Sequence, residues 1–259
     1  MIWANFLSPI DEYTNAPFRI LCQRYGAEAT CIPLINSTAI SRGRRLFDSN
    51  SDEKNLGAQL VGNNPIDIGK STRILDEISH ISWFNLNCGC PSARTRESGG
   101  GSALLDYPKT IIESIEEMKR NTDRPVSVKI RLNTLKQTME LCKDIKSAGA
   151  DFIIIHGRTA KQGYSGKADW SVIKTIKEEV DCLIVGNGDI TSLEQGKKRV
   201  EEGYCDSFMI ARAAMTHPLV FSGKLIDQGC DSRKSLFLEY LRLYQKYVGE
   251  PEIKDLKLK

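Results

Sequence analysis

Short apolar runs alternate with longer amphipathic stretches along most of the chain. The apolar runs predict eight strands, at residues 3–7, 29–34, 57–61, 83–87, 126–130, 152–156, 183–186 and 208–211. Between most of them lie helical patterns, of which residues 135–148 show the period best, with Leu135, Met139, Cys142 and Ile145 on one face. Strands alternating with helices predict a parallel sheet, and at 259 residues a closed (β/α)8 TIM barrel is the economical α/β solution.

Several helix boundaries can be placed from local signals. Gly149 follows the pattern at 135–148 and predicts a C-terminal cap there. Asn64 before Pro65 predicts a helix start, and Thr191 followed by Glu194 fits a capping box. The stretch after the second strand is polar and irregular, so its helix is the least defined.

Two segments follow from this pattern. We expect residues 1–225 to form the barrel and residues 226–259 to form a short helical extension. The extension carries Leu236, Tyr240, Leu243 and Tyr247 at helical spacing within 232–248. We expect the last ten residues to be frayed.

Composition places the chain among ordinary globular proteins, with 41% hydrophobic and 27% charged residues. No apolar run approaches the roughly 20 residues that a membrane helix needs, and no basic segment precedes the first apolar residues. We therefore expect a cytoplasmic protein, a monomer, with no membrane partner. The net charge of +3 is compatible with nucleic-acid binding. Basic clusters lie at Arg42, Arg44 and Arg45, at Lys197, Lys198 and Arg199, and at 254–259, although such clusters are more often solvated faces.

The eight cysteines show no disulfide spacing. Six stand singly in apolar contexts and predict buried thiols in a reducing compartment: Cys22, Cys31, Cys142, Cys182, Cys205 and Cys230. Cys88 and Cys90 stand together in NCGCP, but two thiols supply only half of a structural zinc site, so we expect no metal.

Polar residues gather where the predicted strands end, which is where a barrel enzyme keeps its chemistry. In chain order they are Pro9, Gln59, Asn87, Cys90, Lys129, Arg131, His156, Arg158, Asn187, Asp189 and Arg212. Taken singly, Lys129 could reach solvent and His156 could be a satisfied core residue; together they predict an active site. The loops GNGDI and ARAAM follow strands seven and eight, the usual phosphate-binding place in this fold, and Arg212 offers a charged contact.

At this point the sequence resembles a known family, the tRNA-dihydrouridine synthases. The most specific segments are HGRTAKQGYSGKADW at 156–170 and FNLNCGCPSARTRESGGGSALL at 84–105. SVKIRL, GNGDI and the opening SPIDEYTNAPFR agree in order and spacing. This chain carries Glu12 and Ala211 where the family usually has Gly.

The resemblance implies bound flavin mononucleotide (FMN), with NADPH as electron donor and tRNA as substrate. Pro9, Gln59 and Lys129 would hold the flavin ring and His156 would lie against it. The phosphate end would be held by Asn187, Gly188, Ala211 and Arg212, and Asp189 between them would also be a cofactor-binding residue. Asn87 would orient the uracil, Cys90 would protonate it, and Lys129 would stabilise negative charge. Arg158 and Gln162 would serve the site or its RNA. From their position after Cys90, we expect Arg94 and Arg96 to touch the RNA as well.

The family usually adds a helical domain that grips tRNA, whereas one helix and a tail follow the barrel here, so we expect weak, salt-sensitive RNA binding. Three other functions remain open from the sequence. A flavin barrel reductase of a free pyrimidine, resembling dihydroorotate dehydrogenase, would share the fold and cofactor. A Schiff-base aldolase would use Lys129 as its amine. A non-catalytic RNA-binding protein is the third, and the intact rim argues against it.

Overall fold

The computed structural model describes residues 3–44, 47–223 and 230–250 of the chain, with side chains from residue 233 in the last segment. Eight strands form one parallel sheet in the order β1-β8-β7-β6-β5-β4-β3-β2. A parallel bridge from Phe6 to Ala29 links β1 to β2 and closes the barrel, as predicted. The strands are β1 (Asn5–Leu7), β2 (Thr30–Asn36), β3 (Leu56–Val61), β4 (Ile81–Cys88), β5 (Val126–Leu132), β6 (Phe152–Thr159), β7 (Leu183–Asn187) and β8 (Ser207–Ile210).

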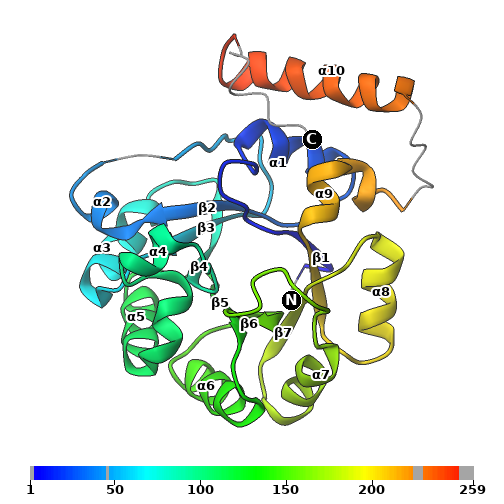
Figure 1. Ribbon diagram of the computed structural model, residues 1–259. Coiled ribbons are helices and arrows are strands. Elements are labelled where there is room, and N and C mark those ends of the chain that lie inside the picture. Colours follow the sequence, from blue (N-terminus) through cyan, green and yellow to red (C-terminus); the bar gives the residue numbers. More distant parts are fainter. Residues whose placement is uncertain (1–2, 45–46, 224–229, 251–259) are drawn as a thin grey trace.

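Helices surround the barrel and alternate with its strands (Figure 1). The longer ones around the wall are α1 (Ala16–Arg24), α3 (Pro65–Asp76), α5 (Pro108–Arg120), α6 (Leu135–Ser147), α7 (Trp170–Glu179) and α8 (Leu193–Glu201). Short helices follow three strands: α2 (Ser37–Ser41), α4 (Ala93–Glu97) and α9 (Arg212–Thr216). Two 3-10 turns, η1 (Gly101–Asp106) and η2 (Pro218–Phe221), and the final helix α10 (Cys230–Tyr247) complete the described elements. Within these residues no helix is both long and apolar enough to cross a membrane.

The predicted boundaries of α3 and α6 are confirmed. The Asn64 side chain accepts the first free backbone N–H groups of α3. Gly149 ends α6 with φ of +98°, a left-handed conformation that glycine adopts without steric cost.

The capping box predicted at Thr191 and Glu194 is wrong by one residue. Ser192 is the N-cap of α8 and accepts a hydrogen bond from the N–H of Gln195. The Gln195 side chain reaches back to the N–H of Thr191 instead. Consecutive Thr and Ser residues compete for the cap, and sequence spacing alone did not distinguish them.

Aromatic rings fill the end of the barrel where the strands begin. Trp3, Phe6, Trp83 and Phe152 contact one another at centroid distances of 5.5–6.5 Å, several of them edge to face. Gly57 stands opposite Trp83, and a β-carbon there would lie 2.3 Å from the indole ring. This plug closes one end of the barrel and leaves the opposite rim for polar groups.

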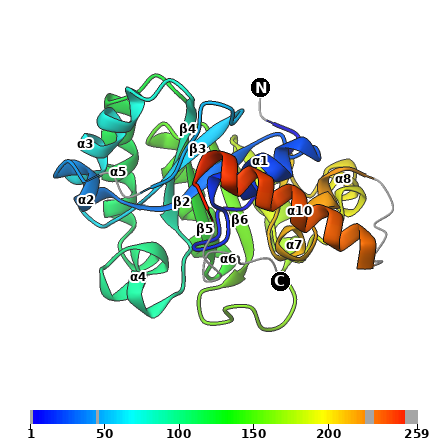
Figure 2. The same ribbon diagram turned by 90° about the horizontal axis from the view of Figure 1, so that it is seen from above.

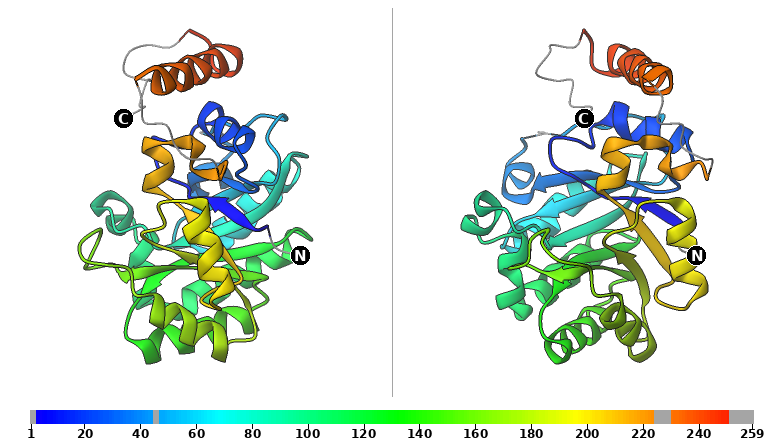
Figure 3. Two further views of the ribbon diagram at one scale, coloured as in Figure 1. Left: turned by 90° about the vertical axis from the view of Figure 1, so that its right-hand side faces the viewer. Right: turned by 45° about the vertical axis from the view of Figure 1, so that its right-hand side comes forward.

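Helix α10 packs along α1 on the outside of the barrel (Figures 2 and 3). Glu239 accepts a hydrogen bond from the Tyr25 hydroxyl and pairs with Arg24, and this hydrogen bond raises the pKa of Tyr25 to about 12. Tyr240 accepts a hydrogen bond from Asn15. Three features expected from the sequence fall outside the described residues: the barrel boundary at residue 225, Arg45 and the tail at 254–259. The side chain of Cys230 is not described either.

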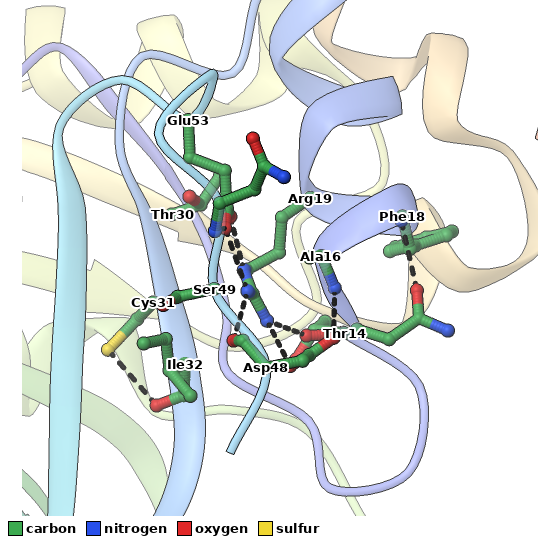
Figure 4. A network of polar contacts seen from close by, with 12 residues as sticks. Thr14, Ala16, Phe18, Arg19, Thr30, Cys31, Ile32, Asp48, Ser49 and Glu53 are labelled. Carbon is green, nitrogen blue, oxygen red and sulfur yellow. Dashed lines mark hydrogen bonds and ion pairs between the residues drawn. The ribbon is translucent and has the colours of Figure 1, made fainter. Parts of the chain in front are cut away.

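A buried ion pair fastens the loop that carries Pro9 (Figure 4). The guanidinium of Arg19 is fully buried and binds both carboxylate oxygens of Glu53, at 2.6 and 3.0 Å. It also donates to the carbonyl of Thr14, which closes the turn after β1, and to Asp48. One side chain of α1 thus holds together the β1–α1 loop and residues 48–53.

Replacing Arg19 with Met should lower the free energy of unfolding by about 3–5 kcal/mol, because the Glu53 carboxylate would remain buried without a partner. Arg24→Met is the matched control, since its ion pair with Glu239 is half exposed and should contribute at most about 1 kcal/mol. Urea denaturation of both variants measures the difference. Equal losses of unfolding free energy in the two variants would show that the buried Arg19–Glu53 pair contributes no more than the exposed Arg24–Glu239 pair.

Candidate active site

Strand register brings the predicted site residues to one rim. Asn87 of β4 stands opposite Lys129 of β5, and His156 of β6 stands opposite Asn187 of β7. Parallel strands of a barrel end at the same face, so residues far apart in the chain meet there.

Lys129 spans the rim from β5 to β7. Its ammonium donates a 3.1 Å hydrogen bond to Oδ1 of Asn187, whose amide nitrogen donates to the carbonyl of Met209. Burial lowers the pKa of Lys129 to about 7, with a further contribution from the positive charge of Arg131. Near neutral pH, Lys129 is therefore an amine whose charge depends on what binds beside it.

Side-chain amides connect β3 to the cysteine loop. Asn87 donates to Gln59 at 2.7 Å, and Gln59 donates to Asn85 at 2.8 Å. The carbonyl oxygen of Asn87 accepts the backbone N–H groups of Gly89 and Cys90. Asn87 therefore fixes the chain around Cys90, and one amide hydrogen of Asn87 has no acceptor among the described residues.

The two neighbouring cysteines differ in environment. Cys88 is fully buried, and burial raises its pKa well above the usual range. Cys90 lies beyond the end of β4, is partly exposed, and contacts the hydroxyls of Ser92 and Thr95. Only Cys90 of this pair is accessible to a substrate at the rim.

Arg158 is buried and satisfied by the protein itself. Its guanidinium donates to both oxygens of Asp189 at 2.7 Å and to the carbonyls of Ser165 and Gly166. Arg212 donates to the same carboxylate at 2.9 Å. Burial acts to raise the pKa of Asp189, but hydrogen bonds from Ala168 and Arg158 outweigh it and lower that pKa. Asp189 therefore stays ionised and positions both arginines, and its φ of +56° marks a strained turn.

His156 is a neutral side chain surrounded by positively charged groups. Burial is the largest cause that lowers its pKa, followed by the charges of Lys129 and the nearby arginines, and the value falls to about 2. The imidazole therefore stays uncharged at any physiological pH.

A cavity of about 540 Å³ opens beside His156, at the ends of β7 and β8. That volume is typical of a cofactor or small-molecule site. The cavity is lined by six of the predicted flavin residues: His156, Asn187, Gly188, Asp189, Ala211 and Arg212. A β-carbon at Gly188 would lie 2.6 Å from that of Ala168, so only glycine lets the backbone pass there.

The other predicted residues lie outside this cavity. Lys129 on β5 is joined to the cavity lining by its hydrogen bond to Asn187, whereas Gln59 on β3 bonds Asn85 and Asn87 of β4. Pro9 is partly buried in the loop after β1. Glu12 of the same loop has a φ of +64°, which explains why glycine suits that position. Arg94, Arg96 and Gln162 are exposed on α4 and on the loop after β6. The Gln162 side chain accepts the N–H of Thr159 within its own turn.

Two residues add contacts that the sequence did not predict: Arg131 was predicted at the rim without a role, and Tyr164 was not singled out at all. Arg131 donates to the carbonyls of Gly89, Thr159 and Gly163, and so ties the cysteine loop to the loop after β6. Tyr164 is exposed and lies between the guanidinium groups of Arg131 and Arg212, at 5.8 and 5.1 Å. The sequence signal for Tyr164 was an aromatic residue inside a motif of otherwise small and polar residues.

No group of three or more potential metal ligands occurs among residues 3–44, 47–223 and 230–250. Each cysteine whose side chain is described is free. Of the basic clusters, Lys197 and Lys198 are exposed on the outer helix α8, whereas Arg199 packs over the rings of Trp170 and Tyr204.

Known proteins of similar structure share the barrel. A 2-naphthoyl-CoA reductase complex matches with a TM-score of 0.65 at 11% identity, covering 84% of this chain and 49% of that one. Morphinone reductase in complex with tetrahydroNAD matches with a TM-score of 0.59 at 10% identity, covering 88% and 89%. At these identities the likeness supports the fold alone.

Sequence comparison is more specific. The family described as Dihydrouridine synthase (Dus) matches residues 6–253. A probable tRNA-dihydrouridine synthase of Aquifex aeolicus is 32% identical, over 94% of this chain and 80% of that protein. tRNA-dihydrouridine synthase B of Pasteurella multocida is 30% identical, over 94% and 78%. With the match spanning all eight strands and the rim residues, the chain belongs to the dihydrouridine synthase family.

Proposed function

We propose that this protein reduces the C5–C6 double bond of uridine in tRNA, using bound FMN and electrons from NADPH. The proposal rests on family membership together with one structural observation: Lys129, paired in register with Asn87, bonds Asn187 in the lining of a cofactor-sized cavity, and Asn87 in turn holds Cys90. We place the enzyme in the cytoplasm, where it would meet a tRNA substrate.

The cavity fits FMN in size and chemistry. Arg212 supplies a cation and Gly188 an unobstructed backbone at the end where the phosphate would lie, after strands seven and eight. Neutral His156 would face the flavin, and Lys129 with Gln59 and Pro9 would hold its ring. When bound and reduced, the flavin supplies a hydride for C6 of the uracil.

The residues of the chain would do the remaining work. The free amide hydrogen of Asn87 would hold a uracil oxygen, because its other polar groups already fix Gln59 and the cysteine loop. Cys90 would give a proton to C5 as a general acid. The uridine must first leave the folded RNA, at a cost of a few kcal/mol.

The cofactor can be tested directly. We expect the purified protein to be yellow and to release FMN on denaturation, identified by chromatography. A colourless protein that does not take up added FMN would contradict the proposal.

A Schiff-base reaction at Lys129 is the second candidate, because a lysine with a pKa near 7 is a nucleophile at neutral pH. Borohydride trapping with a carbonyl substrate tests it. A lysine adduct at residue 129 in a flavin-free protein would favour this reaction, whereas flavin binding without an adduct would support the reductase.

Arg94 and Arg96 are the exposed cations nearest in sequence to Cys90, both on α4. Replacing both with Ala should weaken tRNA binding and reduce the slope of log affinity against log salt by roughly 1.4–1.8, since each phosphate contact contributes roughly 0.7–0.9. Reduction of the flavin by NADPH should not change.

The control removes the same charge from the outer helix α8, by replacing Lys197 and Lys198 with Ala. Binding measured across a salt series compares the variants. If the two α4 substitutions leave the slope of log affinity against log salt unchanged, another surface holds the RNA.

A further inference from the structure

Two hydroxyl groups surround the sulfur of Cys90. Sγ lies 3.4 Å from Oγ of Ser92 and 3.5 Å from Oγ1 of Thr95. The two oxygens are 2.8 Å apart and are joined by a hydrogen bond that Ser92 donates. Ser92 is exposed, while Thr95 is 8% exposed and lies behind the cysteine.

Local folding produces this arrangement. Ser92 is the N-cap of α4 and accepts the backbone N–H of Thr95, which brings the two side chains together directly after Pro91. Gly101 closes over them with φ of +61°, and a β-carbon there would lie 2.6 Å from the carbonyl of Cys90 and 2.7 Å from the methyl of Thr95. The Thr95 side chain is therefore held against Cys90 from both sides.

The hydroxyl proton of Thr95 is not used by the hydrogen bonds within this cluster. The hydroxyl proton of Ser92 is given to Thr95. Oγ1 of Thr95 accepts from Ser92 and, at 3.5 Å, from the thiol of Cys90, so the hydroxyl proton of Thr95 is used in neither bond. A hydroxyl hydrogen rotates freely about its C–O bond, so Thr95 can accept from the thiol or donate to a thiolate without moving a heavy atom.

We propose that Thr95 is a positioning residue that stabilises the thiolate formed when Cys90 transfers its proton. The inference rests on the proposed function, in which reduced flavin supplies the hydride for C6. As C6 takes up the hydride, the π electron pair of the C5–C6 bond forms the new C5–H bond with the proton of Cys90. The S–H bond breaks and its electron pair stays on sulfur. The Thr95 hydroxyl then donates to the anionic sulfur, and a solvent proton re-forms the thiol through exposed Ser92.

The direct test is the rate of a single turnover. Enzyme reduced beforehand is mixed with excess tRNA, and dihydrouridine formation is followed by rapid quench. Thr95→Val keeps the shape of the side chain and should slow this step about tenfold or more, because hydrogen bonds to charged groups exceed neutral ones by about that factor. Thr95→Ser should restore most of the rate, and flavin reduction by NADPH should be unchanged in both variants.

Ser98→Ala is the matched control for a loosened loop. Its hydroxyl donates to the carbonyl of Thr95 at 2.7 Å, at the end of the same short helix, without contacting the cysteine. We expect its single-turnover rate to equal that of the wild type. Thermal unfolding and flavin content establish that each variant is folded, and Thr95→Ser tests the hydroxyl even where the valine variant unfolds.

Combining Thr95→Val with Cys90→Ala separates this inference from the proposed function. If Thr95 acts through the thiol, the second substitution should add little to the loss from Cys90→Ala. The role of Thr95 would be overturned, and that of Cys90 left intact, by either of two results. One is that Thr95→Val lowers the rate by the same factor with Cys90 and with Ala at position 90; the other is a wild-type rate for Thr95→Val. A wild-type rate for Cys90→Ala would overturn both.

Discussion

Replacing Cys90 with Ala should lower dihydrouridine formation by about 10²–10⁴-fold, which is the usual contribution of a positioned general acid. Flavin content should remain, because Cys90 does not line the cavity beside His156. The measurement is dihydrouridine formed per minute in tRNA, alongside the flavin absorbance of each preparation.

Cys88→Ala provides the matched comparison two residues away. Cys88 is fully buried in the hydrophobic core, so its loss should cost some stability and little activity. Equal loss of activity in the two variants would mean that neither thiol has the assigned role.

Lys129→Met should weaken flavin binding and slow reduction by NADPH at least tenfold. Methionine fills a similar volume but lacks the ammonium, which stands beside Asn187 where negative charge on a flavin would need compensation. The affinity is measured by titrating apoprotein with FMN, and the reduction rate by stopped flow. Unchanged affinity and rate would remove Lys129 from the site.

The same substitution has a second readout that needs no cofactor. The pKa of Lys129 is about 7 in the folded protein, against about 10.4 in an unfolded chain, so folding disfavours its charged form. The free-energy cost of burying Lys129 is present in full below pH 7. It falls as the pH rises from 7 to 10.4 and is absent above that range.

The Lys129→Met apoprotein should therefore be more stable than wild-type apoprotein at pH 6, on the order of 1–4 kcal/mol, since one unit of pKa corresponds to about 1.4 kcal/mol. The gain should vanish near pH 10.5. A variant that is less stable at pH 6 would show that the ammonium is satisfied in the folded state.

The strands were predictable because their apolar centres are continuous and separated by helical patterns. Their ends were less so, since β6 continues through the polar residues Gly157, Arg158 and Thr159. Hydrophobicity cannot mark a strand whose last side chains face a polar rim. The first strand is shorter than expected because its pairing with β8 begins only at Asn5.

That the polar rim residues lie together was predictable, but the contacts between them were not. Order along the strands predicted that Lys129, His156 and Asn187 would meet. The bonds of Arg158 to Asp189, 31 residues later, and of Arg131 to the cysteine loop depend on how loops fold over the rim. Such non-local pairings leave no periodic signal in one sequence.

The central claim is that the chain reduces uridine within tRNA. The most direct measurement incubates the purified, FMN-loaded protein and NADPH with tRNA from a strain lacking dihydrouridine, and in parallel with free uridine and uracil. Mass spectrometry of the digested RNA should reveal a gain of two hydrogens at defined uridines, dependent on Cys90, with little turnover of the free compounds. Turnover of free uracil with unmodified tRNA would contradict the account and assign the barrel to a free pyrimidine.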